Sequence, residues 1–193
     1  MSERSAQAET MLWRRLDRPG HEAARLVFHA PFWQLTGTAV FAEGAVPCRL
    51  EYQVTCDPSW RTRHAQLTGW FGTRRIVCTI SADAKQRWRL DGRESNAVEG
   101  CLDLDLSFSP ATNLLPVRRL ALPVGQAAPV RAAWLRFPEC RLEPLDQRYH
   151  RMDTERYRYE SGAGAETFRA ELRVTPAGFV AEYSGLWIAE TPS

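Results

Sequence analysis

Two acidic residues in the middle of the chain have a spacing that could support acid chemistry or binding of a polar group. In the segment GCLDLDL, Asp103 and Asp105 alternate with leucines. This period of two predicts a β-strand with both carboxylates on one face. Buried neighbouring carboxylates need cations or hydrogen-bond donors to stay ionised. Arg61 and Arg63 in the segment WRTR share the two-residue spacing. We therefore expect Arg61, Arg63 or Arg118 to form an ion pair with one of the acids.

The acidic pair permits a catalytic and a non-catalytic interpretation. As catalytic carboxylates, Asp103 and Asp105 would indicate a glycoside or ester hydrolase. Glycosidase carboxylates flank the scissile bond, however, whereas two such residues on one strand face lie about 6–7 Å apart and flank nothing. Structural pairing across a sheet explains the same pattern. We assign no catalytic residue and keep the hydrolase as an alternative.

The two arginines of WRTR are candidates for binding a polar head group. Guanidinium groups hold phosphate, sulfate or carboxylate through paired hydrogen bonds. Internal pairing of Arg61 and Arg63 with the acids explains their spacing equally well. Both interpretations apply if the charged network lines a cavity.

Aromatic residues are spread along the chain and could line such a cavity. Trp and Tyr rings pack on sugars and acyl chains, but they also fill β-sheet cores. Trp88 and Trp187 lie next to turn signals, where an opening is expected. The full aromatic set is Trp60, Trp70, Trp88, Trp134, Tyr149, Tyr157, Tyr159, Tyr183 and Trp187.

The segment TNLLPVRRL departs from the strand pattern. It predicts a short helix over Thr112–Leu122, capped by Thr112 or Asn113. Asn113 and Arg118 could form a lid or head-group site, or the leucines could make the helix a plug that closes the roll. The complete predicted ligand-binding set is Trp60, Arg61, Arg63, Trp88, Asp103, Asp105, Asn113, Arg118 and Tyr149.

Composition and motifs exclude several functional classes. The 193 residues carry a net charge of +2 and Lys85 as the single lysine, which does not suit nucleic-acid binding. The chain lacks a G-x-S-x-G motif, zinc-binding histidine spacing and a glycine-rich phosphate loop. We predict no nucleic-acid partner, metal or cofactor.

The cysteines and the apolar segments predict a compartment. The five cysteines are widely spaced and form no C-x-x-C pair, so we expect free thiols and no disulfide. The sequence shows no signal-peptide pattern and no apolar run long enough to span a bilayer. These features predict a cytoplasmic protein without a transmembrane segment.

Short segments of β-forming residues between turn signals predict an all-β protein with one short helix. We expect one domain over residues 1–193, a tail over about residues 1–10, and weak helix or disorder over Ala6–Leu16. A dozen strands favour a curled antiparallel sheet, barrel or roll. The predicted strands are Ala24–Phe28, Trp33–Phe41, Cys48–Thr55, Trp60–Trp70, Arg74–Ser81, Arg87–Asp91, Gly100–Phe108, Val130–Phe137, Arg141–Asp146, Gln147–Asp153, Glu155–Ser161, Phe168–Val174 and Val180–Trp187.

The order of these motifs resembles a known family. WRTR, the stretch from Asp91-Gly92 to GCLDLDL, TNLLPVRRL, AWLRFPECRLEPLDQRYHRMD, YRYES and GLW together resemble the "Putative glycolipid-binding" family of bacterial proteins, over roughly Trp13 to Trp187. The resemblance implies a spiral β-roll, similar to the half-open barrels with which bacterial lipoprotein carriers hold acyl chains. It also implies an amphipathic ligand such as a glycolipid.

Non-catalytic binding of an amphipathic molecule is the function that fits both the residues and the resemblance. Apolar and aromatic side chains would hold the acyl part, and the charged set would hold the head group. A protein-interaction module is a further alternative, for which a large exposed apolar patch would be the sign.

Overall fold

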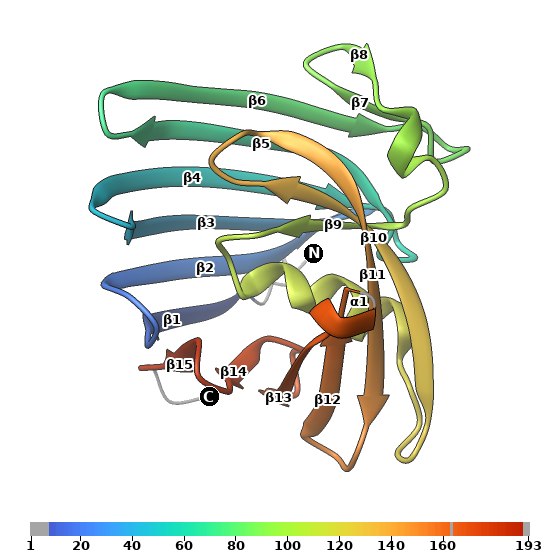
Figure 1. The fold of residues 1–193 in the computed structure, drawn as a ribbon. Coiled ribbons are helices and arrows are strands. Elements are labelled where there is room, and N and C mark those ends of the chain that lie inside the picture. The colour runs from blue at the N-terminus through green and yellow to red at the C-terminus, as the bar shows by residue number, and fades with distance from the viewer. Residues whose placement is uncertain (1–7, 163, 191–193) are drawn as a thin grey trace, which may run out of the picture.

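All described strands belong to one continuous sheet that curls on itself (Figure 1). The structure is a computed structural model and describes residues 8–162 and 164–190. The strand order is β8-β7-β6-β5-β4-β3-β2-β1-β15-β14-β13-β12-β11-β10-β9. Neighbours are antiparallel except β9 and β10, which are parallel. The strands are β1 (Glu9–Arg15), β2 (Gly20–His29), β3 (Phe32–Glu43), β4 (Val46–Cys56), β5 (Thr62–Phe71), β6 (Arg74–Ala82), β7 (Trp88–Leu90), β8 (Arg93–Glu94), β9 (Asp103–Leu106), β10 (Ala127–Arg136), β11 (Arg141–Arg151), β12 (Arg156–Ser161), β13 (Phe168–Val174), β14 (Val180–Tyr183) and β15 (Trp187–Ala189).

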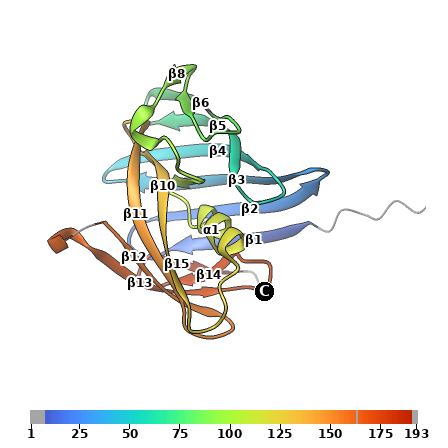
Figure 2. The ribbon, with the colours of Figure 1, turned by 90° about the vertical axis from the view of Figure 1, so that its right-hand side faces the viewer.

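A short helix occupies the inside of the curl. Helix α1 (Leu114–Leu120) follows a 3₁₀ turn at Ala111–Asn113, and two views place it in the hollow between the sheet halves (Figures 1 and 2). Its residues Leu114, Leu115 and Val117 are buried. The predicted helix is therefore confirmed, and it packs against the core. Further 3₁₀ turns lie at Asn96–Val98 and Gly164–Glu166.

Pairing of the first and last strands joins the two halves of the sheet. β1 pairs with β15, with Trp13 opposite Ala189. The Trp13 ring is fully buried, its Nε1 donates to the carbonyl of Val180, and it lies edge-on to Phe179 at 5.6 Å. This contact fixes β1 to the C-terminal strands.

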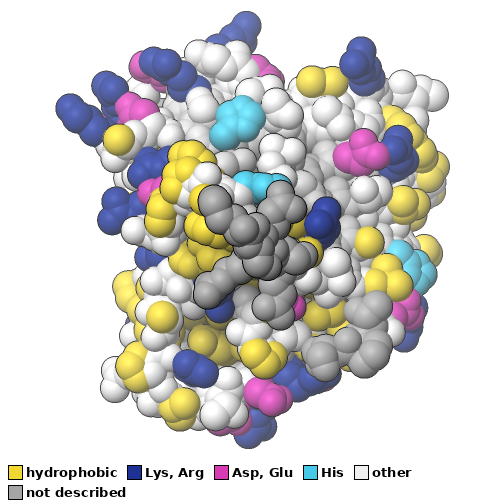
Figure 3. All heavy atoms as spheres, turned by 180° about the vertical axis from the view of Figure 1, so that it is seen from behind, with side chains coloured by type: hydrophobic (Ala, Val, Ile, Leu, Met, Phe, Trp, Pro, Cys, Tyr) yellow, Lys and Arg dark blue, Asp and Glu magenta, His cyan; other side chains and the backbone are white. Residues whose placement is uncertain are grey.

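Alternation along the long strands separates the core from the outer face. In β4, Leu50, Tyr52 and Val54 are buried while Arg49 and Glu51 are exposed. The same alternation is expected of an antiparallel sheet with one solvated side. Seen from behind, basic, acidic and apolar side chains are interspersed over the surface (Figure 3).

Strand β9, which carries the acidic pair, lies inside the roll. One edge pairs with β10. At the other edge the Thr62 amide donates to the carbonyl of Leu102 at 2.9 Å, and the Thr62 hydroxyl accepts from the amide of Leu104 at 3.1 Å. Leu104 and Asp103 are each 1% exposed, whereas Asp105 is half-buried, so the strand is covered on both faces at Asp103 and its carboxylate face opens at Asp105.

The predicted elements differ from the structure mainly near the chain start. Glu9–Arg15 forms strand β1 where weak helix or disorder was expected, because Met11 and Trp13 enter the core and β1 has a partner on each side. The remainder of the predicted tail, residues 1–7, lies outside the described residues. The predicted strands Arg141–Asp146 and Gln147–Asp153 form the single strand β11. The predicted strand Val180–Trp187 is divided into β14 and β15.

Within the described part of the chain, no helix has the length and apolar character needed to cross a membrane.

Candidate functional site

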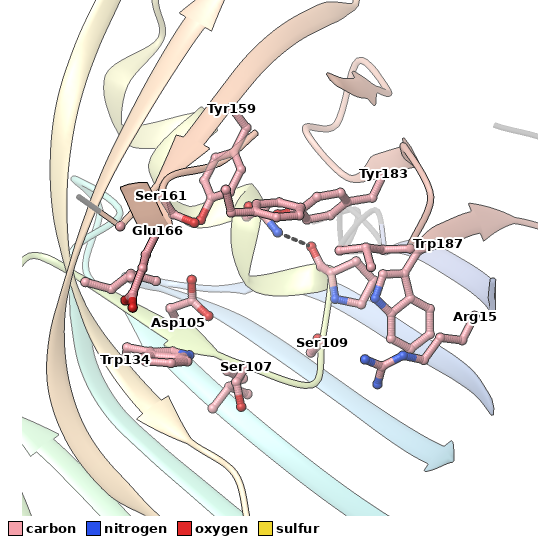
Figure 4. Close-up of a pocket in the computed structure, with 17 residues that line it drawn as sticks. Arg15, Asp105, Ser107, Ser109, Trp134, Tyr159, Ser161, Glu166, Tyr183 and Trp187 are labelled. Carbon is pink, nitrogen blue, oxygen red and sulfur yellow. Dashed lines mark hydrogen bonds between the residues drawn. The ribbon is translucent and has the colours of Figure 1, made fainter. Parts of the chain in front are cut away.

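A cavity of about 420 Å³ lies inside the roll (Figure 4). Strands β1, β9, β10, β11, β12, β13, β14 and β15 and the segment before α1 contribute to its walls. Its volume is within the range of roughly 300–1,000 Å³ that small-ligand sites occupy. The lining residues are Arg15, Asp105, Leu106, Ser107, Ser109, Pro110, Asn113, Trp134, Leu145, Tyr159, Ser161, Gly162, Glu166, Phe168, Tyr183, Leu186 and Trp187.

Aromatic rings supply much of the apolar wall. Tyr159 lies edge-on to Tyr183 with ring centroids 5.8 Å apart, and Phe168 is 6.4 Å from Tyr159. Phe168 is 41% exposed, whereas both tyrosines are buried, so Phe168 lies at the mouth. Trp134 and Trp187 occupy separate ends of the cavity (Figure 4). Rings at both ends and along one side can pack against flat apolar faces of a ligand.

One end of the cavity is acidic. Asp105 and Glu166 lie near Trp134 in the close-up (Figure 4). The Oδ2 atom of Asp105 accepts a hydrogen bond from Gln147 at 2.6 Å. Burial raises the pKa of Asp105 to about 6, and the nearby charge of Asp103 adds to the increase. Above that pH this end presents a carboxylate that can accept hydrogen bonds from ligand hydroxyl groups.

The other end carries an arginine whose donors are not all used. Arg15 stacks over the ring of Trp187 at 4.9 Å and over Phe41 at 5.5 Å. Its Nε donates to Asp17 at 2.8 Å. The side chain is 8% exposed, and its Nη1 atom is buried without a hydrogen-bond partner among the described residues. Arg15 therefore keeps a donor for a ligand oxygen at this end.

A buried carboxyl group lies behind Ser109. Glu22 is 1% exposed, and its Oε1 accepts hydrogen bonds from Tyr52 at 2.6 Å and Ser109 at 2.5 Å. Burial raises the pKa of Glu22 to about 7, while the two donors and the positive charge of Arg15 oppose the increase. The network fixes the Ser109 hydroxyl, which also accepts from the amide of Ala111 at 3.1 Å.

Asn113 lines the cavity and Tyr149 supports it from the core. The Tyr149 hydroxyl donates to Asn113 Oδ1 at 2.8 Å, and Asn113 Nδ2 donates to the carbonyl of Pro110 at 3.2 Å. Tyr149 is 1% exposed and its ring lies 5.1 Å from that of Tyr159. Burial raises the pKa of Tyr149, so its hydroxyl stays protonated and orients the amide.

The acidic pair is held differently from the prediction. Asp103 forms a bidentate ion pair with Arg119, with contacts of 2.9 and 2.6 Å to Nε and Nη2. Among the described residues, none of Arg61, Arg63 and Arg118 pairs with either acid, so the expected ion pair was wrong. Asp103 does not line the cavity while Asp105 does. The two acids therefore do not face one substrate bond as a hydrolase pair would.

The segment WRTR does meet β9, but through Thr62 rather than through its arginines. Arg61 is exposed, and Arg63 donates to Asp57 Oδ2 at 2.6 Å and to the carbonyl of Asp83 at 2.7 Å. Because side chains alternate along a strand, an inward Thr62 places its neighbours on the other face. The arginine pair is therefore outside the cavity.

The remaining predicted residues lie away from the cavity. Trp88 is 1% exposed and its Nε1 donates to the carbonyl of Cys101 at 2.9 Å, so it belongs to the core. Trp60 and Arg118 line a second pocket at the other end of α1. Of the nine predicted residues, Asp105 and Asn113 line the cavity, and Tyr149 contacts Asn113.

Sequence reasoning missed Arg15, Glu22, Ser109 and Glu166. Glu22 carried a usable signal, since the alternation of β2 places a charged residue among buried positions. Arg15 and Glu166 come from sequence regions with no chemical motif.

The five cysteines are free thiols. Within residues 8–162 and 164–190, no cluster of His, Cys, Asp and Glu could hold a metal ion.

Comparison with known proteins assigns the chain to a family. A crystal structure of a DUF1089 family protein (PA1994) from Pseudomonas aeruginosa is similar, with a TM-score of 0.75 and 33% sequence identity over 86% of this chain and 90% of that one. The search of curated proteins gave no match. The model of the family described as "Putative glycolipid-binding" matches residues 10–189. The chain therefore belongs to the family described as "Putative glycolipid-binding".

Proposed function

We propose that the protein binds a glycolipid or a similar amphipathic molecule without chemical conversion, with the sugar in the 420 Å³ cavity. The observation that carries this proposal is the combination of aromatic walls with polar groups at both ends of one cavity. Sugars combine apolar ring faces with hydroxyl groups, and such a cavity offers partners for both. Membership of the glycolipid-binding family supports the same class of ligand.

The polar groups are arranged to hold a hydroxylated head group. The Asp105 carboxylate accepts hydrogen bonds at one end, and the free Nη1 of Arg15 donates at the other. Ser107, Ser109 and Ser161 add hydroxyl groups along the cavity. Donors and acceptors on opposite sides can orient a neutral sugar without requiring a charged ligand.

The acyl chain of the bound ligand would extend out of the cavity through its mouth. Phe168 is exposed there, and the apolar side chains of Leu145 and Leu186 also line the cavity. These side chains can cover the first methylene groups of an alkyl chain. Each buried methylene adds roughly 0.8 kcal/mol, or about fourfold in affinity.

Titration calorimetry with alkyl β-glucosides of six to ten carbons tests this function. We expect affinity to rise with chain length up to a plateau that reports how many methylenes are covered. Trp134→Ala should weaken binding roughly threefold to tenfold through loss of ring packing. Trp70→Ala is the matched control, because Trp70 lies in β5, is 38% exposed and does not line the cavity.

Two outcomes would contradict the proposal. One is absence of binding for the whole alkyl series. The other is binding that Trp134→Ala and Asp105→Asn leave unchanged, which would place the ligand elsewhere.

We also propose a cytoplasmic location. The unpaired state of all five cysteines supports a reducing compartment.

A further inference from the structure

A second pocket of about 400 Å³ lies at the end of α1 away from the glycolipid cavity. The turn between β13 and β14, the end of α1 and the loop before β5 surround it. Its lining contains two arginines and no aspartate or glutamate among the described residues. The lining residues are Trp60, Val117, Arg118, Ala121, Arg151, Thr154, Tyr157, Val174, Thr175, Pro176 and Gly178.

Arg118 is held in this pocket by packing rather than by a counter-ion. Its guanidinium carbon lies 4.9 Å from the ring centroid of Trp60. No side-chain hydrogen bond or ion pair joins the Arg118 guanidinium to any other residue that the structure describes. A half-buried guanidinium without an acidic partner retains all five N–H donors for an incoming anion.

The Trp60 ring beneath Arg118 is itself packed against a second ring. Trp60 is 8% exposed and stacks on Trp33 with centroids 4.5 Å apart and an interplanar angle of 17°. On the other side the Arg118 stem passes against Gly178, where a Cβ atom would lie 2.9 Å from Arg118 Cδ. The stem is thus confined between a ring and a glycine. Such confinement lowers the entropy that binding would otherwise remove.

Arg151 is oriented toward the same pocket by backbone carbonyl groups. Its three nitrogen atoms donate to Leu122 at 2.8 Å, Thr154 at 3.0 Å and Asp153 at 3.1 Å. These bonds use three of five donors and do not neutralise the charge. The hydroxyl oxygen of Thr175, which also lines the pocket, is buried without a hydrogen-bond partner.

We propose that this pocket binds a phosphoryl group. Two guanidinium groups and a free hydroxyl suit an anion with several oxygens around one centre. A carboxylate has only two oxygens and would use fewer of these donors. The site is separate from the glycolipid cavity, and its argument uses none of the residues on which the proposed function depends.

The direct test is calorimetric titration of the full chain with inorganic phosphate. We expect saturable binding that weakens as sodium chloride is raised, because salt screens charge interactions. Arg118→Gln should weaken binding about tenfold or more, since it removes charge-assisted hydrogen bonds. Arg74→Gln is the matched control, because Arg74 also lies over a ring, that of Phe71, but outside this pocket.

A second variant separates positioning from charge. Gly178→Ala keeps every charge but displaces the Arg118 stem and strains the turn, where φ is +96°, so we expect weaker phosphate binding at unchanged net charge while an unchanged circular dichroism spectrum shows that the fold is kept. Phosphate binding that neither Arg118→Gln nor Gly178→Ala reduces would overturn the proposal, as would absence of saturable binding.

Short-chain lipids identify the source of the phosphoryl group. Dihexanoyl phosphatidic acid that binds more tightly than phosphate, with the same dependence on Arg118, would support a lipid head group. Equal affinities would support a free phosphate or phosphate monoester. Alkyl glucoside binding should be unchanged in Arg118→Gln, so loss of glucoside binding in Trp134→Ala and loss of phosphate binding in Arg118→Gln are separable results.

Discussion

Replacing Glu22 by glutamine should change how the stability of the protein depends on pH. The Glu22 carboxyl group is buried, and burial raises its pKa from an ordinary value of 4.5 to about 7. Glutamine has nearly the same shape and can still accept the hydrogen bonds from Tyr52 and Ser109. Its amide group cannot ionise. The substitution therefore removes a titration while it keeps most of the packing.

The sign of the effect follows from proton uptake. Between pH 4.5 and about 7 the folded protein holds a proton on Glu22 that the unfolded chain has released. The free energy of unfolding must then fall as pH rises. The contribution is complete below pH 4.5 and is lost as pH rises through 7. A pKa change from 4.5 to about 7 corresponds to roughly 3 kcal/mol.

Glutamine also introduces a cost that does not depend on pH. The Oε2 atom of Glu22 is buried without a partner, so the amide nitrogen that replaces it has donors without acceptors. An unsatisfied buried donor costs about 1–3 kcal/mol. We therefore expect the variant to be less stable than the wild type at pH 5 and to approach or exceed it at pH 8.

Urea denaturation between pH 5 and pH 8.5 measures this difference directly. The wild-type free energy of unfolding minus that of Glu22→Gln should decrease by about 2.5 kcal/mol across the range, because part of the full effect is already lost at pH 5. Glu51→Gln is a control, because Glu51 is exposed on the outer face of β4. Parallel pH profiles for wild type and Glu22→Gln would refute the argument that Glu22 is a buried titrating group.

Three further predictions test the surrounding structure. Arg119→Ala should destabilise the protein by about 3–5 kcal/mol in urea denaturation, because it leaves the buried Asp103 carboxylate unpaired; a loss below 1 kcal/mol would contradict that pairing. Gly37→Ala should destabilise the fold, because an ideal Cβ would lie 2.4 Å from Tyr52 Cζ; an unchanged denaturation midpoint would show that the ring moves freely. Titration of the denatured, non-reduced protein should find five thiols, and three or fewer would indicate a disulfide.

Strand periodicity predicted much of the fold because its physical basis is local. Most strands have alternating residues between turn signals, and the helix at Leu114–Leu120 has a sequence without that alternation. Strand β1 escaped prediction because its stability depends on Trp13, which packs against Phe179 from the far end of the chain. Contacts between distant segments leave little trace in local sequence pattern.

The site was predicted less completely because charge partners are a matter of tertiary geometry. The same-face spacing of Asp103 and Asp105 is real, but Arg119 rather than Arg61 or Arg63 reaches Asp103. Side chains alternate along a strand, and it is Thr62 that faces β9. Its neighbours Arg61 and Arg63 therefore point away from the two acids. Sequence alone does not reveal which of two alternating sets enters the core when both contain polar residues.

The position of α1 explains why two sites of different polarity fit within one roll. The segment before the helix places Asn113 on the 420 Å³ cavity, and its last turn places Arg118 on the second pocket, for which we propose a sugar and a phosphoryl group respectively. Between these two residues, Leu114 and Leu115 are at most 1% exposed, so an apolar layer separates the two ends. Arg119, on the same turn as Arg118, forms an ion pair with Asp103 of β9. Two consecutive arginines thus have different roles because they point to different sides of the helix: one anchors the helix to the inner strand, and the other remains unpaired and able to bind an anion.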